Sequence, residues 1–174
     1  ALGIPKLWGD LFGVALFAVM LGTGRTLYAK IGRNIGKVLT LGAAGATVCY
    51  FVAAVTGAPV VGLLACAFTG FCTSMLWPGN LVVASSRFPQ GGVFIYAMMA
   101  AGGDMGASVG PQLVGVITDG IIAAPWAAEM AAKLRLTTEQ LGMKAGMLCG
   151  MLFPLVAVFV FLHIWKTQKE KSAV

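Results

Sequence analysis

The chain has 174 residues, of which 59% are hydrophobic and only 10% are charged. A soluble domain carries roughly 25% charged residues, so this composition excludes a water-soluble monomer, and its richness in apolar residues excludes a disordered chain. The net charge of +6 does not indicate a nucleic-acid partner, because the basic residues are not gathered on one exposed surface. We therefore expect the lipid bilayer to be the main environment of the chain.

Long uncharged runs divide the chain into five candidate membrane helices. The run 38–86 holds 49 residues without a charge, and the 31 residues of 88–118 contain only Asp104. Crossing the hydrocarbon layer takes about 20 apolar residues, and only a helix satisfies its own backbone there over runs of this length. We predict an all-α polytopic bundle with membrane helices at 7–27, 37–56, 59–86, 91–118 and 138–166.

The connections between these helices predict an orientation. The first connection, at 24–37, contains four basic residues and no acid, which places it in the cytoplasm by the positive-inside rule. Counting alternately, the connections at 56–59 and 119–144 lie outside, whereas 85–92 and the C-terminal tail lie inside. We expect an integral protein of a bacterial inner membrane or a plasma membrane, with a cytoplasmic C-terminus.

The last connection ends in a recognisable helix start. After Pro125, the segment 126–136 is typical of a short helix at the interface. Thr137 and Gln140 then have the spacing of a capping box, which predicts the beginning of the last membrane helix.

Two series of glycines at spacing four occupy the last two membrane helices. Small residues at this spacing share one helix face and allow membrane helices to approach closely. We therefore expect helix packing at two sets of positions: Gly102, Gly106 and Gly110, and Gly142, Gly146 and Gly150.

Asp104 is an acid near the centre of an otherwise uncharged membrane helix. Such a residue costs roughly 2.5 to 3.5 kcal/mol at mid-bilayer, so it normally faces a cavity or a partner. At 100° per residue it lies on the side opposite Gly102, Gly106 and Gly110. Three roles stay open: coupling to a proton or substrate, a structural hydrogen bond, and pairing with a residue in sequence that is missing here.

The third predicted helix carries a polar stripe. Its members project within a sector of about 80°, with Ser74 beside them: Thr69, Thr73, Trp77 and Asn80. Pro78 should bend or open the helix and free backbone carbonyls. An aromatic ring beside hydroxyl and amide groups suits a small polar solute such as a sugar. Equally, the hydroxyls could bond their own helix while Trp77 fills space.

Other chemistry has little support in the sequence. The four cysteines lie in apolar segments without the close spacing of metal ligands, as expected of small core residues: Cys49, Cys66, Cys72 and Cys149. His163 is expected to pack at the inner membrane boundary. No phosphate loop and no nucleophile paired with a base occur. We therefore expect no enzyme activity, no metal and no cofactor.

The basic connection resembles the loop motif of the major facilitator superfamily. In that motif a glycine leads through an acid to a basic residue and then to Gly-Arg, and the matching positions are Gly24, Arg25, Lys30, Gly32 and Arg33. The connection is one residue longer than the usual form, and Tyr28 and Ala29 stand where the family has its acid. The side chain to which the family's gating contact is ascribed therefore has no carboxylate counterpart at these positions.

Two further segments, 68–92 and 100–115, are similar to the tenth and eleventh helices of facilitators related to fucose permease and other sugar carriers. The resemblance implies that the five helices correspond to helices eight to twelve of a twelve-helix transporter, in a partial C-terminal six-helix bundle. In that family two bundles enclose a cavity and work by alternating access. By this implication, Asp104 and the polar stripe belong to cavity-lining helices.

These observations predict secondary active transport of a small polar solute, a sugar or organic acid, by proton-coupled symport. The partners would be the solute, a proton or other coupling ion, and the missing N-terminal half of the same transporter. Without that half, the fragment alone is expected to be inactive. The alternative is a non-transporting membrane module, such as a subunit, a sensor or an assembly domain.

Overall fold

The computed structural model describes residues 6–32 and 34–171. All regular elements in this part of the chain are helices, so the predicted all-α class is confirmed. The elements are α1 (Lys6–Ile31), α2 (Ile35–Val55), α3 (Pro59–Thr73), α4 (Leu76–Arg87), α5 (Gly92–Ile122), α6 (Ala127–Lys133), α7 (Thr138–Gly150) and α8 (Leu152–Lys171).

Five spans are long and apolar enough to cross a membrane, as the sequence predicted. They are Leu11–Ile31, Ile35–Val55, Pro59–Arg87, Gly92–Ile122 and Thr138–Thr167. The third span consists of α3 and α4, and the fifth consists of α7 and α8, each pair separated by a short break. The short helix α6 is the predicted element between the fourth and fifth spans.

Pro78 explains the break between α3 and α4. Proline has no amide proton, so the carbonyl four residues earlier, that of Ser74, loses its helical partner. The α-helix accordingly ends at Thr73 and resumes at Leu76, and the amide of Ser74 bonds the carbonyl of Phe71 only three residues back, at 3.3 Å. The predicted disturbance at Pro78 is thus present, one turn before the proline itself.

Polar side chains fix two of the helix starts. The side chain of Asn34 accepts a 3.0 Å bond from the amide of Lys37 and caps α2. Thr137 and Gln140 form the predicted capping box of α7, with reciprocal bonds of 3.1 Å between the side chain of each and the backbone amide of the other. These caps set the register at which both helices enter the bundle.

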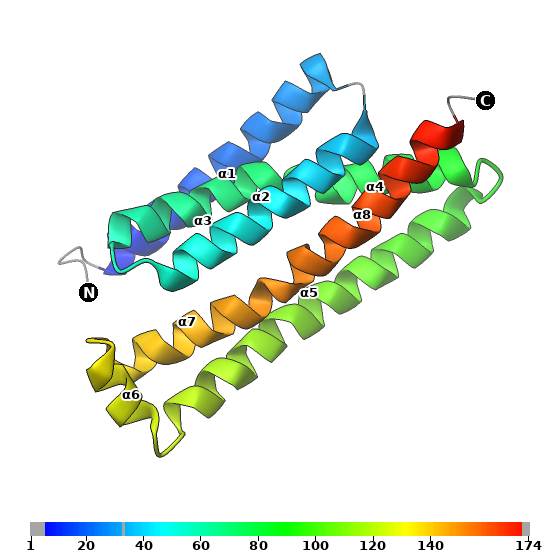
Figure 1. Ribbon diagram of the computed structural model, residues 1–174. Helices are drawn as coiled ribbons and strands as arrows, with labels where there is room; N and C mark the ends of the chain where they lie inside the picture. The colour runs from blue at the N-terminus through cyan, green and yellow to red at the C-terminus, as the bar shows by residue number, and fades with distance from the viewer. Residues whose placement is uncertain (1–5, 33, 172–174) are drawn as a thin grey trace.

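The helix α2 lies at the centre of the bundle, where it contacts α3, α4, α7 and α8 (Figure 1). Its Leu39 and Ala43 are fully buried and join Val83 of α4 and Phe161 of α8 in a small apolar core. On one side α1 packs against α3, and on the other α5 packs against α7.

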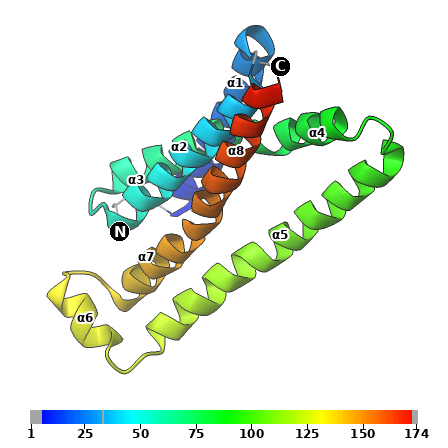
Figure 2. The same cartoon turned by 45° about the vertical axis from the view of Figure 1, so that its right-hand side comes forward.

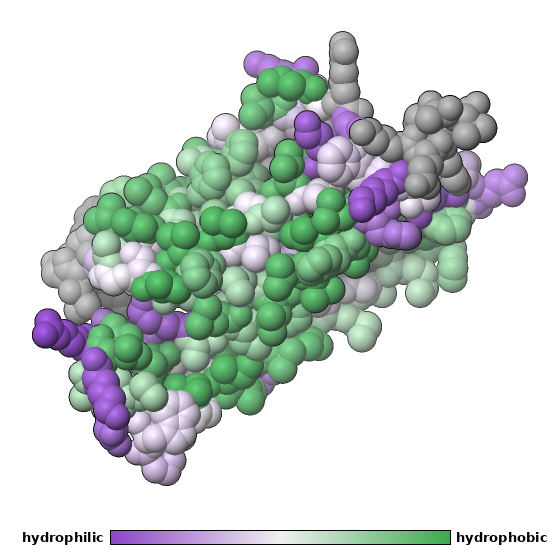
Figure 3. Space-filling view, in the orientation of Figure 1, coloured by the Kyte–Doolittle hydropathy of each residue, from purple (hydrophilic) through white to green (hydrophobic). Residues whose placement is uncertain are grey.

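On the face seen in Figure 3, most hydrophilic residues gather at the two ends of the bundle, and a largely apolar belt lies between them. The connections α1–α2 and α4–α5 and the end of α8 share one end, whereas the α2–α3 turn and α6 lie at the other (Figure 1). Polar ends on either side of an apolar belt are typical of helices that cross the hydrocarbon layer of a membrane. The arrangement also groups together the segments that the charge pattern assigns to one side.

The helix α5 is packed least. None of its residues is buried, and its N-terminal half diverges from α8 and lies apart from the rest of the bundle (Figure 2). Contacts with α7 hold its C-terminal half, while contacts with α4 are few. Two faces of the N-terminal half of α5 are therefore open in the described structure.

Candidate functional site

Asp104 lies near the middle of the 31-residue helix α5, on its open side. Its side chain is exposed, and among the described residues it has no ion pair or side-chain hydrogen bond partner. Ser108, one turn later, donates from its hydroxyl to the backbone carbonyl of Asp104 at 2.9 Å. The structure thus leaves the carboxylate uncompensated by this part of the chain.

Ser108 and Gln112 extend the polar face of α5 beyond Asp104. Both are exposed, and their spacing of four residues keeps them within about 80° of Asp104 around the helix. Sequence reasoning missed these two residues, although the same spacing rule that identified the glycine series would have found them.

Trp77 of α4 contacts α5 next to Asp104 in the chain. A Cβ built on Gly103 would lie 2.5 Å from Cζ3 of the Trp77 indole, so the ring lies directly against the backbone of Gly103. Trp77 is 44% exposed, and Asn80 follows it on α4, half-buried. The structure therefore places an accessible indole beside the residue that precedes Asp104.

The remaining members of the polar stripe are separated from Trp77 and Asn80. The break after Thr73 divides the predicted stripe between α3 and α4, so it does not form one continuous wall. Thr69 and Thr73 donate to carbonyls of their own helix, those of Ala65 and Thr69, each at 2.9 Å. The hydroxyls of these two residues therefore bond their own helix, which is one of the two alternatives for the stripe.

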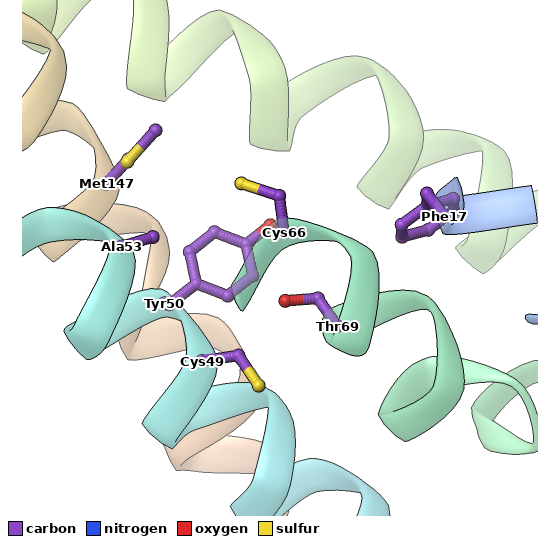
Figure 4. Close-up of a pocket in the computed structure, with 7 residues that line it drawn as sticks. All are labelled: Phe17, Cys49, Tyr50, Ala53, Cys66, Thr69 and Met147. Atoms are coloured by element: carbon purple, nitrogen blue, oxygen red, sulfur yellow. The ribbon is translucent and has the colours of Figure 1, made fainter. Parts of the chain in front are cut away.

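Thr69 also lines a small, partly open pocket of about 260 Å³ between α1, α2, α3 and α7. Figure 4 shows the ring of Tyr50 in this pocket, with Cys49 and Ala53 from the same helix. Cys66, Phe17 and Met147 complete a mostly apolar lining. No lining residue comes from α4 or α5, so this pocket is distinct from the face of Asp104.

The residues that resemble the facilitator loop motif are mostly helical, which corrects their expected placement in a loop. Gly24, Arg25 and Lys30 belong to the last two turns of α1, because the helix continues to Ile31. Gly32 lies in the short connection, and Arg33 lies outside the described residues. Lys30 is exposed.

Arg25 has a specific partner at the helix break. Its Nε donates to the carbonyl of Ser74 at 3.2 Å, which is the carbonyl that Pro78 deprives of a helical partner. Gly24 makes this approach possible, because any Cβ at that position would overlap the side chain of Ser74. The basic segment and the broken helix, 49 residues apart in sequence, are therefore one structural unit.

The two glycine series have different environments. A Cβ on Gly142 would lie 2.8 Å from the carbonyl oxygen of Thr118 on α5, and Gly146 is equally tight against α5. Gly150 is buried against Tyr50 and Val114. By contrast, no described atom lies within 4 Å of a Cβ built on any of three glycines of α5, namely Gly102, Gly106 and Gly110.

The predicted close packing at Gly102, Gly106 and Gly110 is therefore absent from the described structure. The reason is that the N-terminal half of α5 diverges from its neighbours, so this glycine face meets no helix.

Lys144 makes a structural contact that the sequence did not predict. Its Nζ donates to the carbonyls of Ala54 and Thr56 at 2.7 and 2.6 Å. These carbonyls end α2 and lack partners within the helix, so Lys144 ties α7 to α2. Nothing in the local sequence indicates a partner 88 and 90 residues away.

No group of three His, Cys, Asp or Glu residues able to hold a metal ion occurs among the described residues. Comparisons with protein-family models, with curated proteins and with solved structures find no match to this chain. The polar face of α5 and the indole of α4 are therefore the features of this chain that bear most directly on its function.

Proposed function

We propose that this chain is part of a secondary transporter of the major facilitator type, which carries a small polar solute, a sugar or organic acid, together with a proton. The observation that carries the proposal is the exposed, unpaired carboxylate of Asp104 in the middle of a membrane-spanning helix. Lipid contact at that depth would cost roughly 2.5 to 3.5 kcal/mol. The face of Asp104 therefore requires water, a solute or a protein partner.

The groups around Asp104 suit a polar solute. Ser108 and Gln112 offer hydrogen-bonding atoms along one face of α5, and Trp77 offers an exposed aromatic surface beside Gly103. Sugar rings combine an apolar face with many hydroxyls, so an indole against Gly103, together with carboxylate, hydroxyl and amide groups along one face of α5, is a fitting set. A carboxylate without a fixed cation can also bind and release a proton, as symport requires.

The open faces of α5 support a larger assembly. We propose that an N-terminal half of the same transporter covers them, so that the polar face of α5 lines a shared pathway. The described helices alone do not enclose Asp104, which favours an inactive fragment. In this proposal the end with Arg25, Lys37 and Arg87 faces the cytoplasm, together with the C-terminus.

The proposal is tested with the complete transporter in proteoliposomes. We expect Asp104→Asn to abolish accumulation driven by a pH gradient while solute exchange continues, because the amide cannot carry the proton. Asp119→Asn, near the C-terminal end of the same helix, is the matched control and should transport normally. Unchanged accumulation in Asp104→Asn would remove Asp104 from coupling.

Thiol labelling distinguishes a transporter from a non-transporting module. In a background in which all four cysteines are serine, Ser108→Cys should react with a membrane-impermeant thiol reagent and the solute should protect it. Val109→Cys, exposed at a similar depth on another face, should react poorly. Equal, low reactivity at both positions would favour the module, because it would show that no aqueous cavity lies beside Asp104.

A further inference from the structure

A groove runs between α1 and α2, with α3 as its floor. The two helices follow each other in sequence, yet each packs extensively on α3 and scarcely on the other. The groove has a volume of about 600 Å³, which is within the usual range of ligand sites, about 300 to 1,000 Å³. It opens at the end of the bundle that contains the α1–α2 connection.

Glycines explain why the groove exists. Gly24 brings α1 against Ser74, the residue that caps the end of α3, and Gly42 and Gly45 bring α2 against Cys72 of α3. Both helices are therefore held to α3 by close contacts on its two sides, and the space between them is left unfilled.

The walls of the groove are apolar and accessible. Ile31 of α1 is 69% exposed, Leu41 of α2 is 61% exposed, and Phe68 of the floor is 47% exposed. In a chain that spans a membrane, an apolar slot of this kind matches the surface of a lipid acyl chain.

The open end of the groove is polar and basic. Lys37 and Asn34 line it, and both side chains are exposed at the N-terminus of α2, where the backbone amides favour a negative charge. The nitrogen of Lys37 has no acidic partner among the described residues. The acidic side chains that the structure describes lie elsewhere, either at mid-span or at the opposite end: Asp104, Asp119, Glu129 and Glu139.

We propose that this groove binds one anionic phospholipid, with an acyl chain along Ile31, Leu41 and Phe68 and the phosphate on Lys37 and Asn34. The apolar walls match the acyl chain of a phospholipid, and the basic open end matches its phosphate. A free anion would match only the second of these features. The site is separate from the face of Asp104 and does not depend on the transport proposal.

Native mass spectrometry of the complete protein, exchanged from nanodiscs of phosphatidylglycerol or phosphatidylcholine, tests the site. We expect one retained phosphatidylglycerol and far less phosphatidylcholine. A single lysine near an anionic surface changes lipid affinity about five-fold, so Lys37→Gln should lower retention by about that factor. Lys30→Gln removes an exposed charge from the same region outside the groove and should lower retention clearly less than Lys37→Gln.

A second pair of variants tests the acyl-chain part. Leu41→Trp should fill the groove and displace the lipid, whereas Val55→Trp, exposed at the C-terminal end of the same helix, should not. Inorganic phosphate, added at the same concentration as the phosphatidylglycerol, should not displace the lipid. Displacement would overturn the proposal in favour of a free-anion site. Equal losses in Lys37→Gln and Lys30→Gln, or no lipid retained by the wild type, would also overturn it.

Discussion

Pro78 carries no amide proton, so the carbonyl of Ser74 cannot complete the helix to which it belongs. Arg25 supplies the missing donor from a different helix, through a 3.2 Å bond from Nε. A buried carbonyl without a partner costs roughly 1 to 3 kcal/mol. The break in the third span is therefore stable because a cation from the first span compensates for the proline.

This compensation predicts a coupled pair of mutational effects. Arg25→Gln should lower the free energy of unfolding in micelles by roughly 1 to 3 kcal/mol, because the Ser74 carbonyl loses its donor. In a Pro78→Ala background residue 78 has its own amide proton, so the same substitution should cost clearly less. The double-mutant cycle measures this coupling.

Lys30→Gln provides the control for that cycle, since Lys30 is exposed on the same helix. Its effect should be small and equal in both backgrounds. Purely additive effects of Arg25→Gln and Pro78→Ala would contradict the proposed compensation.

The sequence predicted the disturbance at Pro78, because the loss of an amide proton is a local property. It did not predict Arg25 as the partner, since 49 residues separate the two groups. A basic residue near the end of a membrane helix is explained equally well by the positive-inside rule. Only the packing of α1 on α3 shows that this arginine forms a hydrogen bond and is not just a charge at the end of a membrane helix.

At the level of whole helices, glycine spacing identifies a face but not its partner. Gly142, Gly146 and Gly150 lie on the buried side of α7, two of them tight against α5. Gly102, Gly106 and Gly110 have the same spacing and no described neighbour. The spacing is sufficient for close approach, and the arrangement of the other helices decides whether the approach occurs.

The two series therefore predict opposite results for the same substitution. Gly142→Val should destabilise the α5–α7 contact by about 1 to 3 kcal/mol, because its new carbon atoms would meet the backbone of Thr118. Gly106→Val should change stability little when this chain is unfolded in micelles. The measurement is the free energy of unfolding of each variant.

If the complete protein is the transporter proposed above, Gly106→Val also tests what covers this face of α5. If an N-terminal half covers that face of α5, this variant should impair transport although it leaves the stability of the present chain intact. A variant of the complete protein with normal transport would show that the face of Gly106 meets lipid.

For the molecule as a whole, α2 is the element on which the other parts assemble. On one side α2 packs against α3, which in turn contacts α1, and on the other side it packs against α7 and α8. Lys144 strengthens the second contact, because it binds two carbonyls at the C-terminal end of α2. It does so in the last turn of the helix, where carbonyls lack partners and the dipole favours a cation.

Removing this cation should weaken the whole assembly. We expect Lys144→Met to lower the free energy of unfolding by about 1.5 to 3 kcal/mol, since charge-assisted bonds are lost and two carbonyls stay unpaired. Lys133→Met is the matched control, because Lys133 forms only an exposed pair with Glu129 at 2.7 Å and such pairs contribute about 0 to 1 kcal/mol. Equal effects of the two variants would assign Lys144 no bridging role.

By itself, the sequence determined that this is an all-helical chain with five membrane-spanning segments, a capped start at Thr137 and a break near Pro78. Each of these properties follows from local chemistry: charge-free length, a capping side chain and a missing amide proton. Tertiary structure decided which polar groups find partners. Arg25 and Lys144 do, and Asp104 among the described residues does not, because hydrogen bonds between helices depend on how the spans pack in three dimensions.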